Sequence, residues 1–347
     1  MKNILIACVF YVSVFSGCSS LYVIKQGTYQ LELILGSEKI EKALRLPHLD
    51  QKYRKKLMLI QEVREFSQRK LNLKADKNYK TINLEWDKKI YNISASDKVA
   101  FKAYTWWFPI IGAVPYKGFF DEKDALKELK QLKELELDTM KRGVSGYSTL
   151  GYFEDPVWPS MLRMDDASLV ELIIHELAHA TIYFPEQTPF NESFANFVGK
   201  MGAQLFFAHK YGSESTKFKQ VKKSQLQNKI FTNFFNKLYD ALNEIYSSDE
   251  SFDTKVLQKK LQLQQAEKKY KILAKNEGLP SLDWEQVNNA FLLSYKRYNF
   301  DEDVFVQLFH QSKENFETFF RVLSLLSQSK DPFHDLKAHL ISLKESV

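Results

Sequence analysis

Apolar residues recur every three to four positions over most of the chain, which is the spacing of a buried helical face. This pattern predicts helices at 22–46, 50–73, 121–137, 167–184, 188–211, 284–298 and 301–328. Residues 214–275 are rich in Lys, Gln and Leu and predict two long helices with a break at 247–251. Their charges are mixed, so we interpret this segment as a helical hairpin that faces solvent; an arm for a partner or nucleic acid is the alternative.

β-Branched and aromatic residues concentrate between 79 and 120 and predict strands at Thr81–Trp86 and Val99–Trp107. Residues 108–118 are punctuated by Pro and Gly, which predicts an ordered loop with short strands. Val144–Phe153 predicts a strand, or a strand-like edge, leading to the helix at 167–184. The chain is therefore expected to be mainly α (α+β), with a small β element ahead of that helix.

Length and charge narrow the choices further. With 347 residues the chain can bury a large core, and its aromatic content of 14% argues for a packed protein. The formal charge of +6 is spread along the chain, without a basic stripe interleaved with aromatics or a Cys/His finger. We therefore expect no nucleic acid partner.

The chemistry-bearing motif is His175-Glu176-Leu177-Ala178-His179, followed by Glu192. Histidines at i and i+4 share one helix face, where two imidazoles can bind one Zn²⁺, and Glu192 is the expected third ligand. Glu176 is placed to act as general base towards a metal-bound water. Asn196, one turn after Glu192, is a candidate to orient a liganding histidine; a surface or structural Asn is the alternative.

The motif has a helical frame. Asp165 and Asp166 supply capping and dipole-favoured charge, the run 167–184 holds neither Gly nor Pro, and Pro185 ends it. Thr188 is the expected N-cap of the next helix, with Pro at its first position. This places Glu192 in the first turn of a helix that can fold back on the first.

The N-terminus resembles a bacterial lipoprotein leader. Lys2 precedes an apolar run from Ile4 to Phe15, which is too short to span a bilayer but fits a signal segment. Small residues then precede Cys18, as in a lipoprotein cleavage box, although Phe15 stands where Leu is usual. We expect a signal peptide at 1–17, a lipidated Cys18 and one domain at 18–347; an ordinary secretory signal and an uncleaved anchor are the alternatives.

Cysteine usage agrees with this interpretation. The only cysteines are Cys8 and Cys18, so a chain cleaved before Cys18 has neither a disulfide nor a thiolate to offer zinc. Ser19 follows Cys18, where an Asp usually signals inner-membrane retention. We therefore expect a lipid-anchored, periplasm-facing protein in the bacterial envelope, with the outer membrane favoured.

Several long strings resemble the bacterial family of predicted zinc aminopeptidases. They are Trp106–Gly112, Val114–Phe120, Gly143–Phe153 with Asp155-Pro156, Ile174–Ala195, and Asn288–Ala290 with Leu292, Leu293 and Tyr295. The likeness runs from the lipoprotein box to about Leu326. It implies a gluzincin-like site with one Zn²⁺ per chain, the same three ligands and base, and peptide substrates. This chain departs from the expected pattern at Gly146, where Ala is usual, and at Asn196, where Asp is frequent.

Peptide hydrolysis also needs a donor to the developing oxyanion. Tyr147, Tyr152 and Tyr295 are candidates because each lies in a shared string, with a packed core tyrosine as the alternative for each. Val144–Leu150 is a candidate edge strand for pairing with an extended substrate. An aminopeptidase would also need an acid to hold the substrate's ammonium group, for which Glu154 or Asp155 is available.

Two other functions stay open: a zinc endopeptidase, and a non-catalytic envelope lipoprotein that keeps zinc for structure. A structural site would not need Glu176 and would tend to be closed by a fourth protein ligand, so the enzyme is favoured. The remaining histidines show no ligand spacing and are interpreted as surface or structural: His48, His209, His310, His334 and His339.

Overall fold

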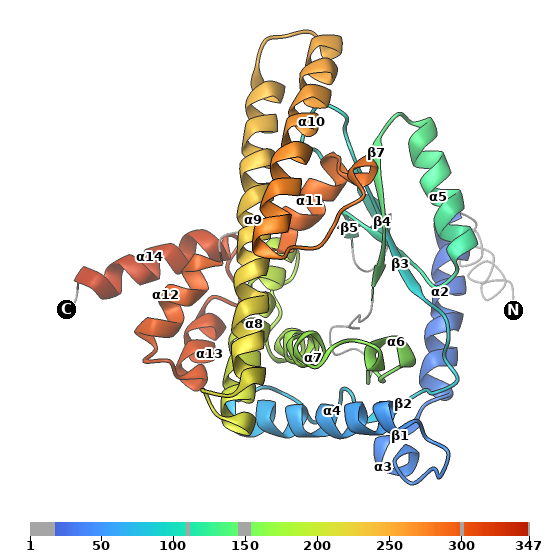
Figure 1. Cartoon of the computed structure of the whole chain (residues 1–347), viewed down its shortest axis with the longest axis vertical. Helices are drawn as coiled ribbons and strands as arrows, with labels where there is room; N and C mark the ends of the chain where they lie inside the picture. The colour runs from blue at the N-terminus through green and yellow to red at the C-terminus, as the bar shows by residue number, and fades with distance from the viewer. Residues whose placement is uncertain (1–17, 109–111, 145–153, 299–301, 346–347) are drawn as a thin grey trace, which may run out of the picture.

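The fold is mainly helical with small sheets, as the sequence predicted, and the helix that carries His175 and His179 lies at its centre (Figure 1). The computed structural model describes residues 18–108, 112–144, 154–298 and 302–345. In Figure 1, helix α7 (Asp166–Thr181) lies between α4 (Gln51–Lys70) below it and the sheet region above it. Helices α8 (Thr188–Tyr211) and α9 (Thr216–Ser247) run along one side of this centre.

Helix α7 is buried on most sides, as its apolar sequence demands. The Asp165 side chain caps it by accepting a hydrogen bond from Ser168 N at 2.9 Å. The apolar positions of its interior are fully buried: Leu169, Val170, Ile173, Ile174, Leu177 and Ala178. They join one large core with α4, α8 and the C-terminal helices. A helix packed in this way is a rigid platform for its polar side chains.

A second core lies under the helical hairpin. Helix α9 and helix α10 (Phe252–Glu277) are joined at 248–251, and the Ser251 hydroxyl caps α10 by accepting from Thr254 N. Helix α11 (Asn289–Tyr298) packs at the base of this hairpin around Phe231, Phe235 and Tyr270. The predicted hairpin and its break are confirmed, and its upper part projects from the body in Figure 1.

The β element centres on a three-stranded antiparallel sheet. Its order is β6 (Lys117–Phe119), β3 (Ile90–Ser96) and β7 (Asp138–Val144), with Ile90 opposite Val144 and Ser96 opposite Asp138. Helix α5 (Glu122–Glu134) packs on one side of the sheet and α11 on the other (Figure 1). The short strands predicted within 108–118 appear as β5 and β6, apart from residues 109–111, which lie outside the described residues.

The other elements complete the body. They are α2 (Cys18–Leu35), β1 (Glu38–Lys39), α3 (Ile40–Ala43), β2 (Thr81–Ile82), β4 (Trp106–Phe108), β5 (Gly112–Val114), α6 (Pro159–Leu162), η1 (Trp284–Gln286), α12 (Asp303–Gln311), α13 (Phe316–Leu325) and α14 (Pro332–Glu345). Among the described residues, every helix is too short or too polar to cross a bilayer.

The single helix predicted at 22–46 is wrong. Helix α2 stops at Leu35, and a short strand and the one-turn helix α3 follow. The carbonyl of Leu33 accepts hydrogen bonds from Asn83 Nδ2 at 3.1 Å and from Ser37 Oγ at 2.7 Å. These contacts satisfy the end of the helix, and one of them comes from a residue fifty positions away.

The strand predictions were also partly wrong. Only Thr81–Ile82 of the first predicted strand lies in a strand. Of the second, Trp106–Trp107 lies in a strand and Ala103 forms an isolated bridge with Ser96. The main strands β3 and β7 were missed because their polar residues face neighbours that the local pattern does not reveal. Val144 is the last described residue of β7. Residues 145–153, which hold the rest of the strand predicted at Val144–Phe153, lie outside the described residues.

Several helix boundaries differ from prediction, among them the ends of α4 at Lys70 and of α5 at Glu134. Helix α7 ends at Thr181 rather than 184, and the N-cap of α8 is Gln187, with Thr188 already helical. The region 284–298 holds a 3₁₀ turn before α11, and 301–328 is two helices, α12 and α13. Helix α14 was not predicted. Boundary shifts of this size reflect tertiary contacts at helix ends, which override local propensity.

Candidate metal centre

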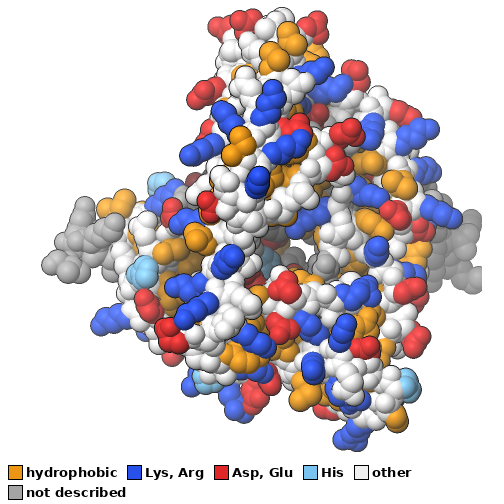
Figure 2. All heavy atoms as spheres, viewed as in Figure 1, with side chains coloured by type: hydrophobic (Ala, Val, Ile, Leu, Met, Phe, Trp, Pro, Cys, Tyr) orange, Lys and Arg blue, Asp and Glu red, His pale blue; other side chains and the backbone are white. Residues whose placement is uncertain are grey.

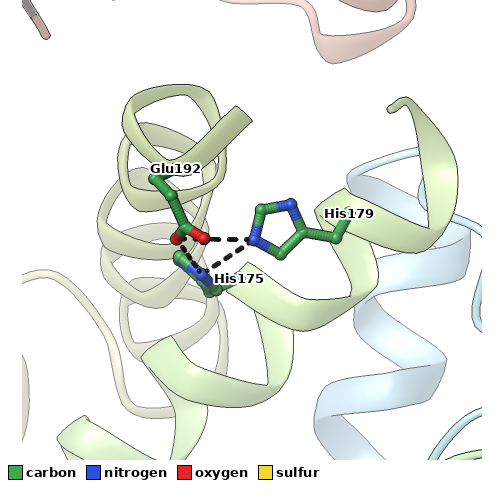
Figure 3. Close-up of side chains that lie close together, drawn as sticks. All are labelled: His175, His179 and Glu192. Carbon is green, nitrogen blue, oxygen red and sulfur yellow. Dashed lines mark hydrogen bonds and ion pairs between the residues drawn. The ribbon is translucent and has the colours of Figure 1, made fainter. Parts of the chain in front are cut away.

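Two histidines on α7 and one glutamate on α8 converge in Figure 3. His175 and His179 lie one turn apart on α7, and their Nε2 atoms are 3.1 Å from each other. Glu192 Oε2 lies 3.5 Å from His175 Nε2 and 3.7 Å from His179 Nε2. These three side chains are 5 to 13% exposed, so the cluster is buried but reachable. The sequence-predicted ligand set is therefore brought together.

A buried asparagine sets the turn that delivers Glu192. The side-chain oxygen of Asn191 accepts from Phe184 N at 2.9 Å, and its amide donates to Phe184 O at 2.7 Å. Both residues are almost fully buried. Asn191 thus ties the segment after α7 to the first turn of α8, one residue before Glu192. This role was missed from sequence, because it depends on a contact across the turn.

Glycines let the two helices approach closely. A Cβ at Gly199 would come within 3.0 Å of Glu171 O and 3.2 Å of His175 Cβ. A Cβ at Gly202 would come within 2.8 Å of side-chain atoms of Ile174 and Leu71. Backbones this close place a residue at the start of α8 within reach of both histidines. The distance between α7 and α8 therefore contributes to the geometry of the cluster.

The Glu192 carboxylate is held in its ionised form. Burial alone would raise its pKa, but hydrogen bonding to His175 and His179, with their attraction, lowers the pKa far below that of a free glutamate. One turn before His175, Glu171 shows the opposite effect, because burial raises its pKa. The cluster thus offers one anionic oxygen ligand between two imidazoles.

The spacing of the donor atoms fits a zinc ion. A tetrahedral ion with bonds of about 2.0–2.1 Å separates neighbouring ligand atoms by about 3.3 Å. The three separations measured here, 3.1, 3.5 and 3.7 Å, scatter around that value. One ligand atom of each of the three residues lies within 4.8 Å of the other two, so that one ion could contact all three. Two imidazoles and one carboxylate are also a donor set that zinc accepts, with a fourth position left for a small molecule.

A tyrosine not proposed from the sequence shares this space. Burial raises the pKa of Tyr116 to about 12, with further contributions from the charges of Glu192 and Glu176. The guanidinium of Arg297 stacks 5.3 Å from the Tyr116 ring centre and donates to Pro115 O at 3.4 Å. The Tyr116 phenol therefore stays protonated near neutral pH and lies close enough to Glu192 and Glu176 for their charges to act on it. It lies within one of the shared sequence strings, but that string alone did not distinguish it from its neighbours.

A cavity of about 660 Å³ is lined by residues of β7, α9, α11 and the segment 278–287. Figure 2 shows the surface hollowed in this region. The lining includes four consecutive residues of β7, from Met140 to Gly143, and reaches Ser168 at the start of α7. Successive strand residues point to opposite faces, so a cavity that touches four in a row runs along the strand edge.

The edge of β7 is capped at one end and faces the cavity at the other. Asn288 Nδ2 donates to Thr139 O at 2.9 Å, so the backbone of Thr139 points away from β3. In an antiparallel pair the N–H and C=O of one residue point the same way, and this direction alternates along the strand. The backbone groups of Lys141 and Gly143 therefore also point away from β3, towards the cavity.

The remaining predicted site residues are placed as follows. Tyr295 packs its ring against Phe231 and Phe235 and lines the cavity. Tyr147 and Tyr152 lie outside the described residues. Their role as donors, like that of Tyr295, stays a prediction.

The candidate acids and the orienting asparagine differ in exposure. Glu154 is exposed, whereas Asp155 is 1% exposed and its backbone bonds Asn78 and Tyr79. Asn196 lies on α8 one turn after Glu192 and is half-buried. The predicted roles of these three residues stay predictions.

Comparison with known proteins finds one family. A family model described as "Putative aminopeptidase" matches residues 21–336. No curated protein matches the chain, and no solved structure does. The matched range contains both helices of the metal centre, the whole sheet and the helical hairpin.

Proposed function

The chain belongs to the family described as "Putative aminopeptidase", and from this premise we propose that it is a zinc-dependent peptidase that releases amino-terminal residues from peptides. The observation that carries the zinc proposal is the convergence of His175, His179 and Glu192 at separations suited to a tetrahedral ion. A zinc ion there would supply a Lewis acid that polarises the scissile carbonyl and makes water more acidic.

The chain's own side chains divide the remaining work. Glu176, next to His175 on α7, would accept the proton of the water that attacks the carbonyl carbon. It would then pass this proton to the departing amine. Tyr116, whose raised pKa keeps its phenol protonated, would donate a hydrogen bond to the oxygen that gains negative charge. Arg297, stacked on its ring, would keep the phenol in place.

The cavity beside β7 would hold the rest of the peptide. An extended chain can bond the N–H and C=O groups of Lys141 and Gly143 as an added strand. The Asn288 contact to Thr139 closes the edge at its other end and so limits where the peptide can lie. Substrates in this proposal are extended peptides whose backbone, rather than one particular side chain, supplies much of the affinity.

A peptide assay tests the proposal and its alternatives. Purified full chain in mild detergent is loaded with zinc and given two matched peptide sets, one with free amino termini and one with acetylated termini. Glu176→Gln is the control, because it keeps the shape of the side chain and removes the base. Cleavage of free-amine peptides alone, lost in the variant, supports an aminopeptidase.

Other outcomes assign other functions. Glu176-dependent cleavage of acetylated peptides would make the protein an endopeptidase. Zinc binding without any Glu176-dependent cleavage of either set would favour a non-catalytic protein. Zinc content measured by elemental analysis on the same samples separates failure to bind metal from failure to catalyse.

We also propose that the protein is anchored in the bacterial envelope through an acylated Cys18 and faces the periplasm, with the outer membrane favoured. The support is the leader pattern at 1–17 and the absence of Asp after Cys18. Feeding cells an alkyne-tagged palmitate should label the wild-type chain and not Cys18→Ser. Labelling of neither chain would refute acylation at Cys18.

A further inference from the structure

Helix α2 packs on the body through one face only. The rings of Tyr22 and Phe119 meet at 5.4 Å, and Gln26 Oε1 accepts from Phe120 N at 3.1 Å. Tyr29 packs against Phe120, and Leu33 is fully buried. Positions 22, 26, 29 and 33 repeat every three to four residues, so they form a single helical stripe. Among the described side chains, those on the opposite face take no part in this packing.

That opposite face carries an exposed apolar stripe, defined here as Ile24, Leu31 and Leu35. Their exposed fractions are 56%, 54% and 74%. At about 100° per residue they lie close to one line along the helix, about 180° from the inward face. Three large aliphatic side chains in a row on a free helix face are unusual for a surface in contact with water.

The charged side chains of α2 that flank the stripe form ion pairs with residues outside α2. Lys25 pairs with Asp124 at 2.5 Å, and Glu32 pairs with Lys88 at 2.5 Å. These partners hold the charged side chains of α2 on the side that faces the rest of the protein. The stripe can therefore meet an apolar surface without desolvating a charge of its own helix.

The chain that precedes α2 suggests what this surface is. Apolar residues run from Ile4 to Phe15, and α2 begins at Cys18, the proposed acylation site. At about 1.5 Å per residue, Ile24 lies about 9 Å and Leu35 about 26 Å along the helix from Cys18. Acyl chains on Cys18 would hold the start of α2 at a bilayer, with the stripe within reach of the interface.

We propose that the stripe lies in the interface of a lipid bilayer, so that α2 is a membrane-docking helix as well as a spacer. This inference rests on the proposed acyl anchor and not on the proposed catalysis. A buried apolar face adds affinity to that of the acyl chains and fixes the orientation of the protein on the membrane. Because Tyr22 and Tyr29 fix α2 against the sheet region, the orientation of α2 on the membrane also fixes the orientation of the sheet region.

Single cysteines can report contact with lipid directly. The only native cysteines are Cys8 and Cys18, so Ile24→Cys, Leu31→Cys and Leu35→Cys each add one new thiol. Leu257→Cys and Ile272→Cys on α10, at 58% and 64% exposure, are matched controls. The full chain, as a bacterium makes it, is labelled with bimane and reconstituted in phosphatidylethanolamine–phosphatidylglycerol vesicles. The wild-type chain supplies the background.

Vesicles with brominated acyl chains quench a bimane only where it touches the hydrocarbon region. We expect about a twofold loss of fluorescence at the three stripe positions and little change at the α10 controls. Equal, weak quenching at both sets would overturn the proposal. A bimane at a stripe position that is shielded from water but not quenched by the brominated lipid would also overturn the proposal, because protein rather than lipid would then cover the stripe.

The same samples separate this proposal from the others. If the wild-type chain does not float with vesicles, the acyl anchor fails and the docking helix fails with it. If the chain floats but the stripe is not quenched, the anchor stands and only the docking is refuted. Peptide hydrolysis by the detergent-solubilised chain is measured independently, so its outcome reports on the catalytic proposal alone.

Discussion

The contact between Asn191 and Phe184 gives the sharpest test of how the metal centre is built. Asn191→Ala removes the acceptor of the buried Phe184 N–H, whereas Phe184 O keeps a hydrogen bond from Gln187 N at 3.2 Å. A buried group left without its partner costs about 1–3 kcal/mol. We therefore expect the free energy of unfolding to fall by about 1–3 kcal/mol.

This loss can be measured by thermal unfolding. With an unfolding entropy of about 2.1 cal/mol/K per residue, a chain of this length loses about 1–4 °C in Tm. The same variant should bind zinc about tenfold more weakly in competition with a chelator, because Glu192 is the next residue along α8. The matched control is Asn289→Ala, which also removes buried side-chain hydrogen bonds, with Tyr246, Asp97 and Lys98, but lies in the α11 core.

Comparison of the two variants tests whether the Asn191 turn positions Glu192. Both should lose stability, and only Asn191→Ala should lose zinc affinity. Equal zinc affinities in the two variants would show that the Asn191 turn does not position Glu192. A Tm change below about 1 °C in Asn191→Ala would refute the burial argument itself.

Four further predictions address single groups. Glu192→Gln should weaken zinc binding at least about 100-fold, measured by chelator competition, while the Tm of the metal-free protein changes far less. Tyr116→Phe should lower kcat about 10²–10³-fold with zinc content unchanged, so equal kcat would remove Tyr116 from the mechanism. Burial raises the pKa of Glu171 in the folded protein. The stability that its protonated form contributes is therefore present below the unfolded pKa and is lost as pH rises through the folded pKa. In urea titrations, the stability of Glu171→Gln relative to wild type should increase from acid to neutral pH, and a difference that does not change with pH would contradict this. Gly143→Pro removes an N–H that faces the cavity, so it should raise KM for peptides of four or more residues more than for dipeptide amides, and equal changes would argue against strand addition.

Much of the helical fold followed from local sequence patterns, because helices depend on residues three and four positions apart. Asp165 and the apolar run after it predicted α7, and Asp121 and Ser251 cap helices close to the predicted starts. The site followed for the same reason. A spacing of four places His175 and His179 on one face of any helix that contains them, and the turn at Pro185 returns the chain to bring Glu192 near.

Contacts between distant segments decided the rest. Strand β3 pairs with β7 fifty residues away, so its Asn and Ser residues gave no local signal of a central strand. The charge of Glu192 acts on Tyr116 only because tertiary packing brings the segment between β5 and β6 near α8. The stripe on α2 is exposed only because Tyr22 and its neighbours face inward. Local periodicity determined which side chains share a helix face, while tertiary packing alone determined which faces meet, which are left exposed and which polar groups end up beside the metal centre.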